Sequence, residues 1–182
     1  MKIGLVRHFK VAHKNYKPYC YPKEFHSAMQ EYDEADIIIG KTDLNGIDWE
    51  VCFSSSYKRA FETAQNIFNK EIIKTDLIRE VPLLPFTLLK IKLPWFIWHI
   101  GARIAWSNNA KSQNETKQET NERMLLMYQK ILETKRQNIL VVSHGFFMKC
   151  FSRFLTVNGY KGTIDLFPQN GHLYIFSKIV KE

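Results

Sequence analysis

Two histidines in this sequence lie one residue beyond short apolar runs, and both could act on a phosphoryl group. The run 2–6 leads into Arg7 and His8, and the run 138–142 is followed, after one serine, by His144. A neutral imidazole is a competent nucleophile for phosphorus, and it splits hydrolysis into formation and breakdown of a covalent intermediate. The spacing therefore indicates phosphoryl chemistry if these side chains meet in the fold.

Two arginines, Arg7 and Arg59, could hold the phosphoryl oxygens. The fork-shaped guanidinium group matches such oxygens bidentately, and amides at helix N-termini add further donors. Arg59 falls in the first turn of a helix predicted over 57–69, with the serines at 54–56 expected as its caps. Such a site binds a dianionic group, and the nucleophile is what turns binding into catalysis.

Hydrolysis also needs a group that first gives and then takes a proton, and one carboxyl group can do both. Glu80 follows the short segment Leu77–Arg79 and is the candidate. Asp76 is the nearest alternative acid. The plain alternative for Glu80 is a surface carboxylate paired with Arg79 or a nearby lysine.

The elements that must position these side chains alternate along the chain. Strands are predicted at 2–6, 50–53, 72–75, 138–142 and 172–177, and helices at 57–69 and 124–133. This alternation is typical of βαβ units around a parallel sheet. Ligands gather at the carboxyl ends of such strands, so His8 and His144 share one edge if their strands are neighbours.

Length and cysteine content limit the class of protein. A chain of 182 residues with 45% hydrophobic residues is expected to form one globular domain rather than a disordered chain. Its three cysteines are widely separated and lack CxxC spacing, so neither a disulfide framework nor a zinc site is indicated. The sequence shows no signal peptide, and a reducing cytoplasm fits best.

The charge balance favours an anionic partner. There are 26 basic and 18 acidic residues, giving a formal net charge of +8. The lysines are spread along the chain instead of forming a basic stripe, and no nucleic-acid-binding motif is present, so nucleic acid is not the expected partner. An acidic lipid and a phosphorylated small molecule remain, and the charge alone does not choose between them; the candidate site suits the phosphorylated small molecule.

The segment from Val81 to Trp106 is unusually apolar and contains three of the four tryptophans. It is not a membrane span, because three prolines interrupt it and Lys90, Lys92 and Arg103 would lie at membrane depth. We expect ordinary helical core or a cap packed over the sheet. The alternatives are an apolar substrate pocket, a homodimer interface or peripheral membrane contact.

Taken in order, four motifs give the chain a family resemblance. Arg-His stands at 7–8, Ser-x-x-x-Arg-x-x-x-Thr-Ala at 55–64, Leu-x-x-Glu at 77–80, and Val-Val-Ser-His-Gly at 141–145. This set resembles the histidine phosphatase superfamily, also called the phosphoglycerate mutase-like family. The resemblance implies an α/β fold, a three-layer α/β/α sandwich with a mostly parallel central sheet. It also implies one domain over 1–182, with the apolar cap or insertion at about 81–106.

The same resemblance assigns roles to the candidate residues. His8 would be the nucleophile, Glu80 the acid and base, and Arg7, Arg59 and His144 would hold the phosphoryl oxygens. The implied activity is a metal-independent phosphatase for a small phosphate monoester, since the arginines and histidines already supply positive charge. The alternatives are a mutase that returns the phosphoryl group to substrate, and a phosphate-binding pseudoenzyme without turnover.

Phe9 departs from the family pattern, in which glycine follows Arg-His. If this position required a positive φ, phenylalanine would cost about 1–2 kcal/mol of strain. The departure concerns the surroundings of the substrate more than the phosphate pocket.

Overall fold

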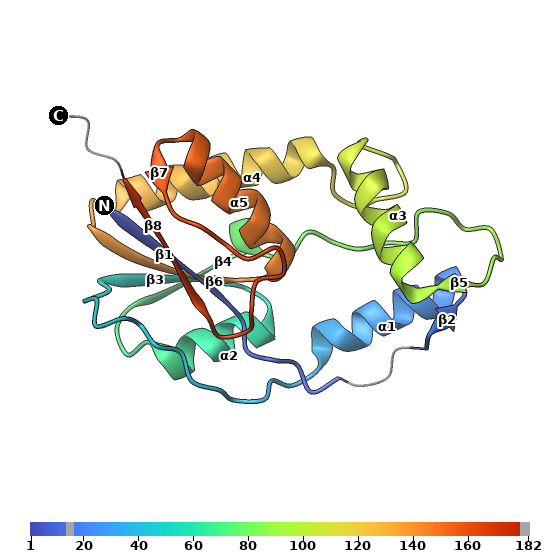
Figure 1. Ribbon diagram of the computed structural model, residues 1–182, viewed down its shortest axis with the longest axis horizontal. Coiled ribbons are helices and arrows are strands. Elements are labelled where there is room, and N and C mark those ends of the chain that lie inside the picture. Colours follow the sequence, from blue (N-terminus) through green and yellow to red (C-terminus); the bar gives the residue numbers. More distant parts are fainter. Residues whose placement is uncertain (14–16, 179–182) are drawn as a thin grey trace. The chain divides into compact units, whose positions relative to one another are not determined.

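The chain folds into two compact units that interleave along the sequence. The computed structural model describes residues 1–13 and 17–178 (Figure 1). Unit 1 holds Met1–Val11, Ile37–Glu80 and the chain from Arg123 onward, and unit 2 holds Ala12–Asp36 and Val81–Glu122. The apolar segment at 81–106 therefore belongs to unit 2, together with the chain that follows the first strand.

Unit 1 is built on a six-stranded sheet in the order β4-β3-β6-β1-β8-β7. The strands are β1 (Lys2–Arg7), β3 (Val51–Ser55), β4 (Ile72–Thr75), β6 (Asn138–Ser143), β7 (Tyr160–Lys161) and β8 (Leu173–Lys178). Strands β4, β3, β6 and β1 are parallel, whereas β8 pairs antiparallel with β1 and β7 antiparallel with β8. The expected mostly parallel sheet is confirmed.

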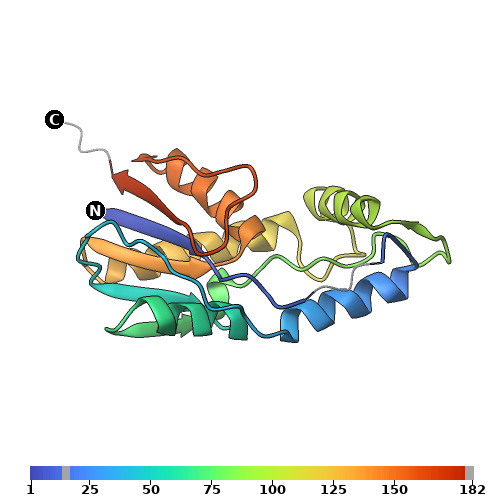
Figure 2. The same cartoon turned by 60° about the horizontal axis from the view of Figure 1, so that its bottom comes forward.

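Helices cover both faces of this sheet. Helix α2 (Lys58–Ile67) lies on one face, and α5 (Gly145–Val157) lies with the end of α4 (Lys117–Glu133) on the other (Figures 1 and 2). Side chains at alternate strand positions divide accordingly. Ile3 and Leu5 join the core under α4 and α5, whereas Val6 joins the core under α2. This alternation produces the three-layer α/β/α sandwich predicted from the sequence.

The expected serine caps of α2 are wrong. Ser54 and Ser55 complete β3, where they pair with β6 and β4, and Tyr57 is the residue that precedes the helix. Their backbone groups are therefore used by the sheet. The Ser55 hydroxyl still accepts a hydrogen bond from the Tyr57 amide at 3.3 Å, and it also reaches a side chain of the candidate site.

Unit 2 is mostly helical. It contains α1 (Pro22–Glu34), α3 (Trp95–Ser107) and a two-stranded sheet of β2 (Tyr19–Cys20) and β5 (Leu93–Pro94). Its small core is formed by Cys20, Phe25 and Trp98, and the rings of Phe25 and Trp98 stack at 5.9 Å between centroids. Helical core or a cap over the sheet was expected for 81–106; helix α3 occupies the second half of this segment, and residues 81–92 form no helix.

The two ends of the first section of unit 2, Ala12 and Asp36, lie next to each other. Val11 and Ile37 form an isolated antiparallel bridge, and the Ile38 amide donates to the Lys10 carbonyl at 2.7 Å. One residue further out, the Ala12 amide donates to the Asp36 carbonyl at 2.8 Å. Residues 12–36 are thus an excursion whose two ends are held together by backbone hydrogen bonds.

Candidate active site

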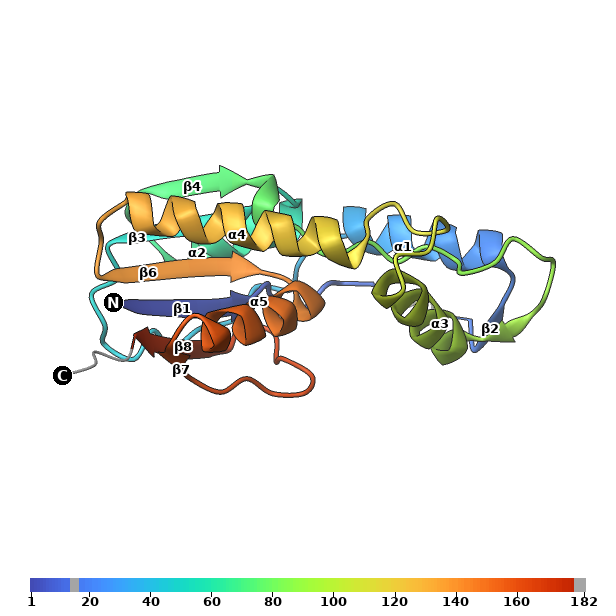
Figure 3. The same ribbon diagram turned by 90° about the horizontal axis from the view of Figure 1, so that it is seen from above.

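The site lies at the carboxyl ends of the two central strands. Strands β1 and β6 run side by side in the same direction, and Arg7 pairs with Ser143 at their ends (Figure 3). The His8 amide continues the pairing by donating to the Ser143 carbonyl at 2.9 Å. His8 and His144 follow these positions, and their ring centroids are 5.1 Å apart. The structure therefore brings the two predicted histidines together.

His8 is buried and its imidazole is fixed by a backbone acceptor. Its Nδ1 lies 2.6 Å from the Phe9 carbonyl oxygen, which can only accept, so Nδ1 carries the proton and Nε2 carries the lone pair. Burial, followed by the charge of Arg59 and more weakly by that of Arg7, lowers the pKa of His8 to about 3, against the raising effect of the Phe9 carbonyl. His8 is therefore a neutral imidazole at physiological pH.

His144 is also buried and neutral. Its Nε2 is hydrogen-bonded to the Ser55 hydroxyl at 2.8 Å, and the Tyr57 ring meets it edge-on at 5.3 Å. Complete burial, followed by the charge of Arg59 and the weaker effects of Arg7 and Arg123, holds the pKa of His144 well below its usual range. Within the described part of the chain, its Nδ1 is buried without a hydrogen-bond partner.

Arg7 stands at the end of β1 and lies against the start of α5. Its Nη1 donates to the Pro168 carbonyl at 2.8 Å, and its buried Nε has no hydrogen-bond acceptor among the described residues. A Cβ on Gly145 would lie 3.3 Å from Nε, so a glycine at the start of α5 leaves room for the guanidinium group. Buried donors of this kind suit a bound anion.

Arg59 is the second residue of α2 and is almost completely buried. Its Cζ lies 5.0 Å from the centroid of the Tyr57 ring. Its charge lowers the pKa of both His8 and His144, which places the guanidinium group close to both imidazoles. Two guanidinium groups and two neutral imidazoles thus gather at one sheet edge.

Glu80 also reaches this edge, at the start of α5. Its Oε2 accepts from the Phe146 amide at 3.1 Å and its Oε1 from the Phe147 amide at 2.9 Å. Glu80 is half-buried, and these backbone bonds distinguish it from a simple surface carboxylate. The amides of Phe146 and Phe147 at the start of α5 are therefore occupied by a carboxylate. Asp76, the alternative acid, is exposed and accepts from the Ser56 hydroxyl.

The turn that carries Glu80 is held from two sides. The turn is the short 3₁₀ helix η1 (Asp76–Ile78). The Ser143 hydroxyl donates to the Ile78 carbonyl at 2.6 Å, and Nη1 of Arg123 on α4 donates to the Leu77 carbonyl at 2.8 Å. The residue beside His144 and a buried arginine therefore fix where Glu80 leaves the turn.

Two residues without an assigned role, Thr63 and Asn170, position the histidine loop. The Phe9 amide donates to Thr63 Oγ1 at 2.9 Å, and that hydroxyl donates to the Arg59 carbonyl at 2.7 Å. Asn170 Nδ2 donates to the His8 carbonyl at 2.7 Å. The four-residue spacing of Arg59 and Thr63 places them on one helix face, which the sequence could have indicated. No sequence signal points to Asn170 or Arg123.

Phe9 is accommodated without backbone strain. Among the described non-glycine residues, positive φ occurs at Asn45, Asn109 and Lys135 only, so the strain considered for Phe9 does not arise. Its ring is buried against two glycines. A Cβ added to Gly40 would lie 3.3 Å from the ring, and one added to Gly171 would lie 3.0 Å from it. The ring therefore packs where two glycines leave space.

Among the described residues, no cluster of three or more histidine, cysteine, aspartate or glutamate side chains could hold a metal ion. No helix within the described residues is long and apolar enough to cross a membrane.

Comparison with known proteins identifies related folds. The family model described as histidine phosphatase superfamily (branch 1) matches residues 34–177, beginning downstream of Arg7 and His8. No curated protein matches the sequence significantly. One structural match below covers the whole chain, the first strand included.

Three solved structures are similar over most of the chain. A putative alpha-ribazole-5′-P phosphatase from Escherichia coli has a TM-score of 0.57 at 16% identity, covering 95% of this chain and 93% of its own. The alpha-ribazole phosphatase from Shigella flexneri has a TM-score of 0.55 at 13% identity, with 100% of both chains covered. A mycobacterial glucosyl-3-phosphoglycerate phosphatase has a TM-score of 0.54 at 14% identity, covering 85% and 78%. At these identities the likeness establishes the fold.

Proposed function

Because the chain belongs to the histidine phosphatase superfamily (branch 1), we propose that it hydrolyses a small phosphate monoester through a phosphohistidine on His8. The supporting observation is the buried, neutral His8, whose Nδ1–H is held by a carbonyl so that Nε2 carries the nucleophilic lone pair.

In the first step, Nε2 of His8 forms a bond to phosphorus while the bond from phosphorus to the leaving oxygen breaks. Glu80, in its protonated form, gives its proton to that oxygen and releases an alcohol. A carboxyl group offers about four lone-pair positions, so the two amide bonds to Glu80 leave room for this proton.

In the second step, a water oxygen bonds to phosphorus and the phosphorus–nitrogen bond breaks, returning the electron pair to Nε2. The Glu80 carboxylate takes the proton of the attacking water and is ready for another cycle. Arg7, Arg59 and His144 hold the non-bridging oxygens and offset the negative charge that develops on them.

The proposed reaction needs no metal ion, because the two guanidinium groups supply the positive charge that a cation provides elsewhere. Cys20, Cys52 and Cys150 are free thiols, and we propose the cytoplasm as the location because its reducing conditions suit them. The proposed partner is a small phosphorylated molecule rather than a nucleic acid.

The test is phosphate release from p-nitrophenyl phosphate and a panel of monoesters, with EDTA present, by the wild type and His8→Ala. The panel includes ribazole 5′-phosphate and glucosyl-3-phosphoglycerate, which the names of the similar structures suggest. We expect the wild type to turn over, and His8→Ala to retain less than about one part in a thousand of that rate.

Residual activity above that level in a folded His8→Ala would overturn the nucleophile assignment. Vanadate binding without turnover on the whole panel would favour the pseudoenzyme instead. A mutase is distinguished by following labelled phosphate, which it returns to substrate and a phosphatase releases to water.

A further inference from the structure

Helix α3 in unit 2 has two apolar faces, and only one of them is covered. Trp98, Ala102 and Trp106 recur every four residues and are buried. Phe96, Ile100 and Ile104 recur at the same interval about half a turn around the helix, and each is more than half exposed. A helix that is apolar all round normally has a partner for both faces.

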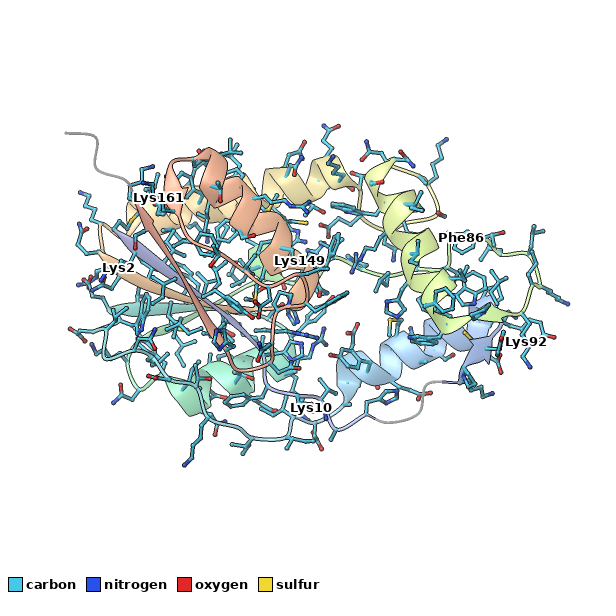
Figure 4. The ribbon with its side chains drawn as sticks, viewed as in Figure 1. Lys2, Lys10, Phe86, Lys92, Lys149 and Lys161 are labelled. Carbon is cyan, nitrogen blue, oxygen red and sulfur yellow. The ribbon has the colours of Figure 1, made fainter. Side chains whose placement is uncertain are left out.

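The segment just before α3 exposes more apolar side chains. Leu88 is 87% exposed, and Leu89 and Ile91 are exposed as well, alternating with the exposed lysines 90 and 92. In Figure 4, Phe86 lies beside α3, and Lys92 lies at the other end of the segment, next to β5. Phe86 packs on Trp98, with ring centroids 4.9 Å apart, so the segment is anchored at its base while its tip is exposed.

We use the term apolar surface for the segment Leu88–Lys92 together with Phe96, Ile100 and Ile104. Tyr19 and Tyr21 flank it, since β2 pairs with β5 through Tyr19 and Pro94. Both tyrosine side chains are exposed. Tyrosine suits the boundary between an apolar and an aqueous phase, because its ring is apolar and its hydroxyl is polar.

Positive charge predominates around the apolar surface, where Glu24 is the carboxylate near Lys92 and is paired with Lys17. The sequence from Val81 to Asn114 contains no aspartate or glutamate, but it contains Lys90, Lys92, Arg103 and Lys111. Arg103 is occupied by the Val81 and Pro82 carbonyls. Lys90 and Lys92 therefore present positive charge directly among the exposed leucine and isoleucine side chains.

From this combination we propose that the apolar surface of unit 2 binds the surface of an anionic lipid bilayer. The leucine, isoleucine and phenylalanine side chains enter the boundary between headgroups and acyl chains, as in interfacial amphipathic segments. Lys90 and Lys92 contact the anionic headgroups, each strengthening binding. The binding is peripheral and does not depend on the phosphatase proposal.

A second copy of the chain is a poorer occupant. A two-fold interface brings the same patch of both copies together. Lys90 and Lys92 of the two copies would then lie in one interface, and the carboxylate beside Lys92, that of Glu24, is already paired with Lys17 in each copy. A lipid surface supplies the missing negative charge.

The test is co-sedimentation of the full-length protein with vesicles of phosphatidylcholine alone or mixed with phosphatidylglycerol. We expect binding to the anionic vesicles at low salt, with an apparent partition coefficient at least about tenfold higher than for the neutral vesicles. Tryptophan emission should shift to shorter wavelength on binding, because Trp95 at the start of α3 is partly exposed.

Three variants separate the contributions. Leu88→Ser/Leu89→Ser and Phe96→Gln/Ile100→Gln should each lower the partition coefficient by about tenfold, through lost apolar contact. Lys90→Gln/Lys92→Gln should abolish the preference for anionic vesicles. The matched control, Leu126→Gln/Leu132→Gln, changes two exposed apolar residues of α4 in unit 1 and should bind as the wild type does.

Equal sedimentation with both vesicle types, or equal binding by the wild type and the surface variants, would overturn the proposal. So would light scattering that shows a dimer which the surface variants convert to monomers without any lipid binding, since the occupant would then be a second copy. Hydrolysis of p-nitrophenyl phosphate by the unbound variants is measured alongside as a check of folding.

Discussion

At the scale of single residues, the candidate site consists of neutral imidazoles beside permanent positive charges. Nε2 of His8 can attack phosphorus only while it is unprotonated, and burial together with Arg59 and Arg7 keeps it so. The same surroundings that make His8 a nucleophile make its protonation costly. That cost is measurable as stability.

The pH dependence of unfolding tests this directly. The pKa of His8 is about 3 when folded and near its usual 6.5 when unfolded, so below pH 6.5 the unfolded state binds more protons. The unfolding free energy of the wild type should therefore decrease as the pH is lowered. His8 should account for about 2–3 kcal/mol of the decrease between pH 7.5 and pH 4.5. The measurement is denaturant unfolding in phosphate-free buffer, with His8→Asn as the control.

Other titrating groups cancel when His8→Asn and the wild type are compared at each pH. A difference between the two proteins that stays constant from pH 7.5 to pH 4.5 would contradict a neutral, buried His8.

The role of Glu80 is tested by leaving groups of different quality. A poor alkoxide leaving group needs a proton far more than p-nitrophenolate does, so Glu80→Gln should slow an alkyl phosphate about 100-fold more than it slows p-nitrophenyl phosphate. The measurement is kcat for both substrates. A structural defect at the start of α5 would slow both equally, and that outcome would assign the proton transfer to another group, with Asp76 the next to test.

At the scale of secondary-structure elements, the histidine loop after β1 is attached to α2 through one hydroxyl. Thr63 accepts from the Phe9 amide and donates to the Arg59 carbonyl, so it links the loop to the helix that carries Arg59. Both Phe9 and Thr63 are buried, so water cannot replace this bond.

Thr63→Val keeps the shape of the side chain and removes the hydroxyl. We expect it to lower the unfolding free energy by about 1–3 kcal/mol, because the Phe9 amide loses its buried acceptor. It should also lower kcat, because His8 and Arg59 lose their common anchor. Thr63→Ser retains the hydroxyl and is the control, and equal stability of the two variants in urea would show that the bond does not position the loop.

Strands with continuous apolar runs were the easiest elements to predict. The expected strand at 72–75 is β4, and the strands expected at 2–6 and 138–142 each extend by one residue, to Arg7 and Ser143. Helix α4 begins at Lys117, before the expected 124, because Thr116 and Glu119 form a capping box that the polar composition of 108–122 obscured. The Thr-x-x-Glu spacing at 116–119 is therefore a local signal for the start of this helix.

The site could be predicted only as far as its residues precede or follow recognisable elements. The strand pattern predicted that His8 and His144 share one edge of the sheet, and the family resemblance added Arg7, Arg59 and Glu80 to them. Asn170 lies 162 residues from the His8 carbonyl that it contacts, and such a pairing depends on the placement of β8 rather than on any local pattern. The capture of the α5 amides by Glu80 likewise follows from tertiary packing.

At the scale of the whole molecule, the chain passes between the two units four times. Unit 2 is assembled from two separate sections, Ala12–Asp36 and Val81–Glu122, and unit 1 from three. A unit made of separated sections depends on the rest of the chain to bring those sections together. The single domain predicted from the sequence therefore remains the expectation for unfolding.

Unfolding measured at two places tests that expectation. Trp49 lies in unit 1, whereas Trp95, Trp98 and Trp106 lie in unit 2, so fluorescence of Trp49→Phe reports on unit 2 alone. We expect its midpoint in urea to coincide with that of far-ultraviolet circular dichroism, which reports on the whole chain. Separate midpoints would show two independently folding domains.

The closed ends of the excursion at residues 12–36 bear on how such a protein can be altered. Val11 and Ile37 are bridged to each other. The path of the chain through the sheet and the histidine loop is therefore independent of the length of the segment between these two residues. A segment of another length could close the same bridge at a small entropic cost. A replacement that still supplies the packing of Cys20 and Phe25 and the pairing of β2 with β5 would leave His8 in its place.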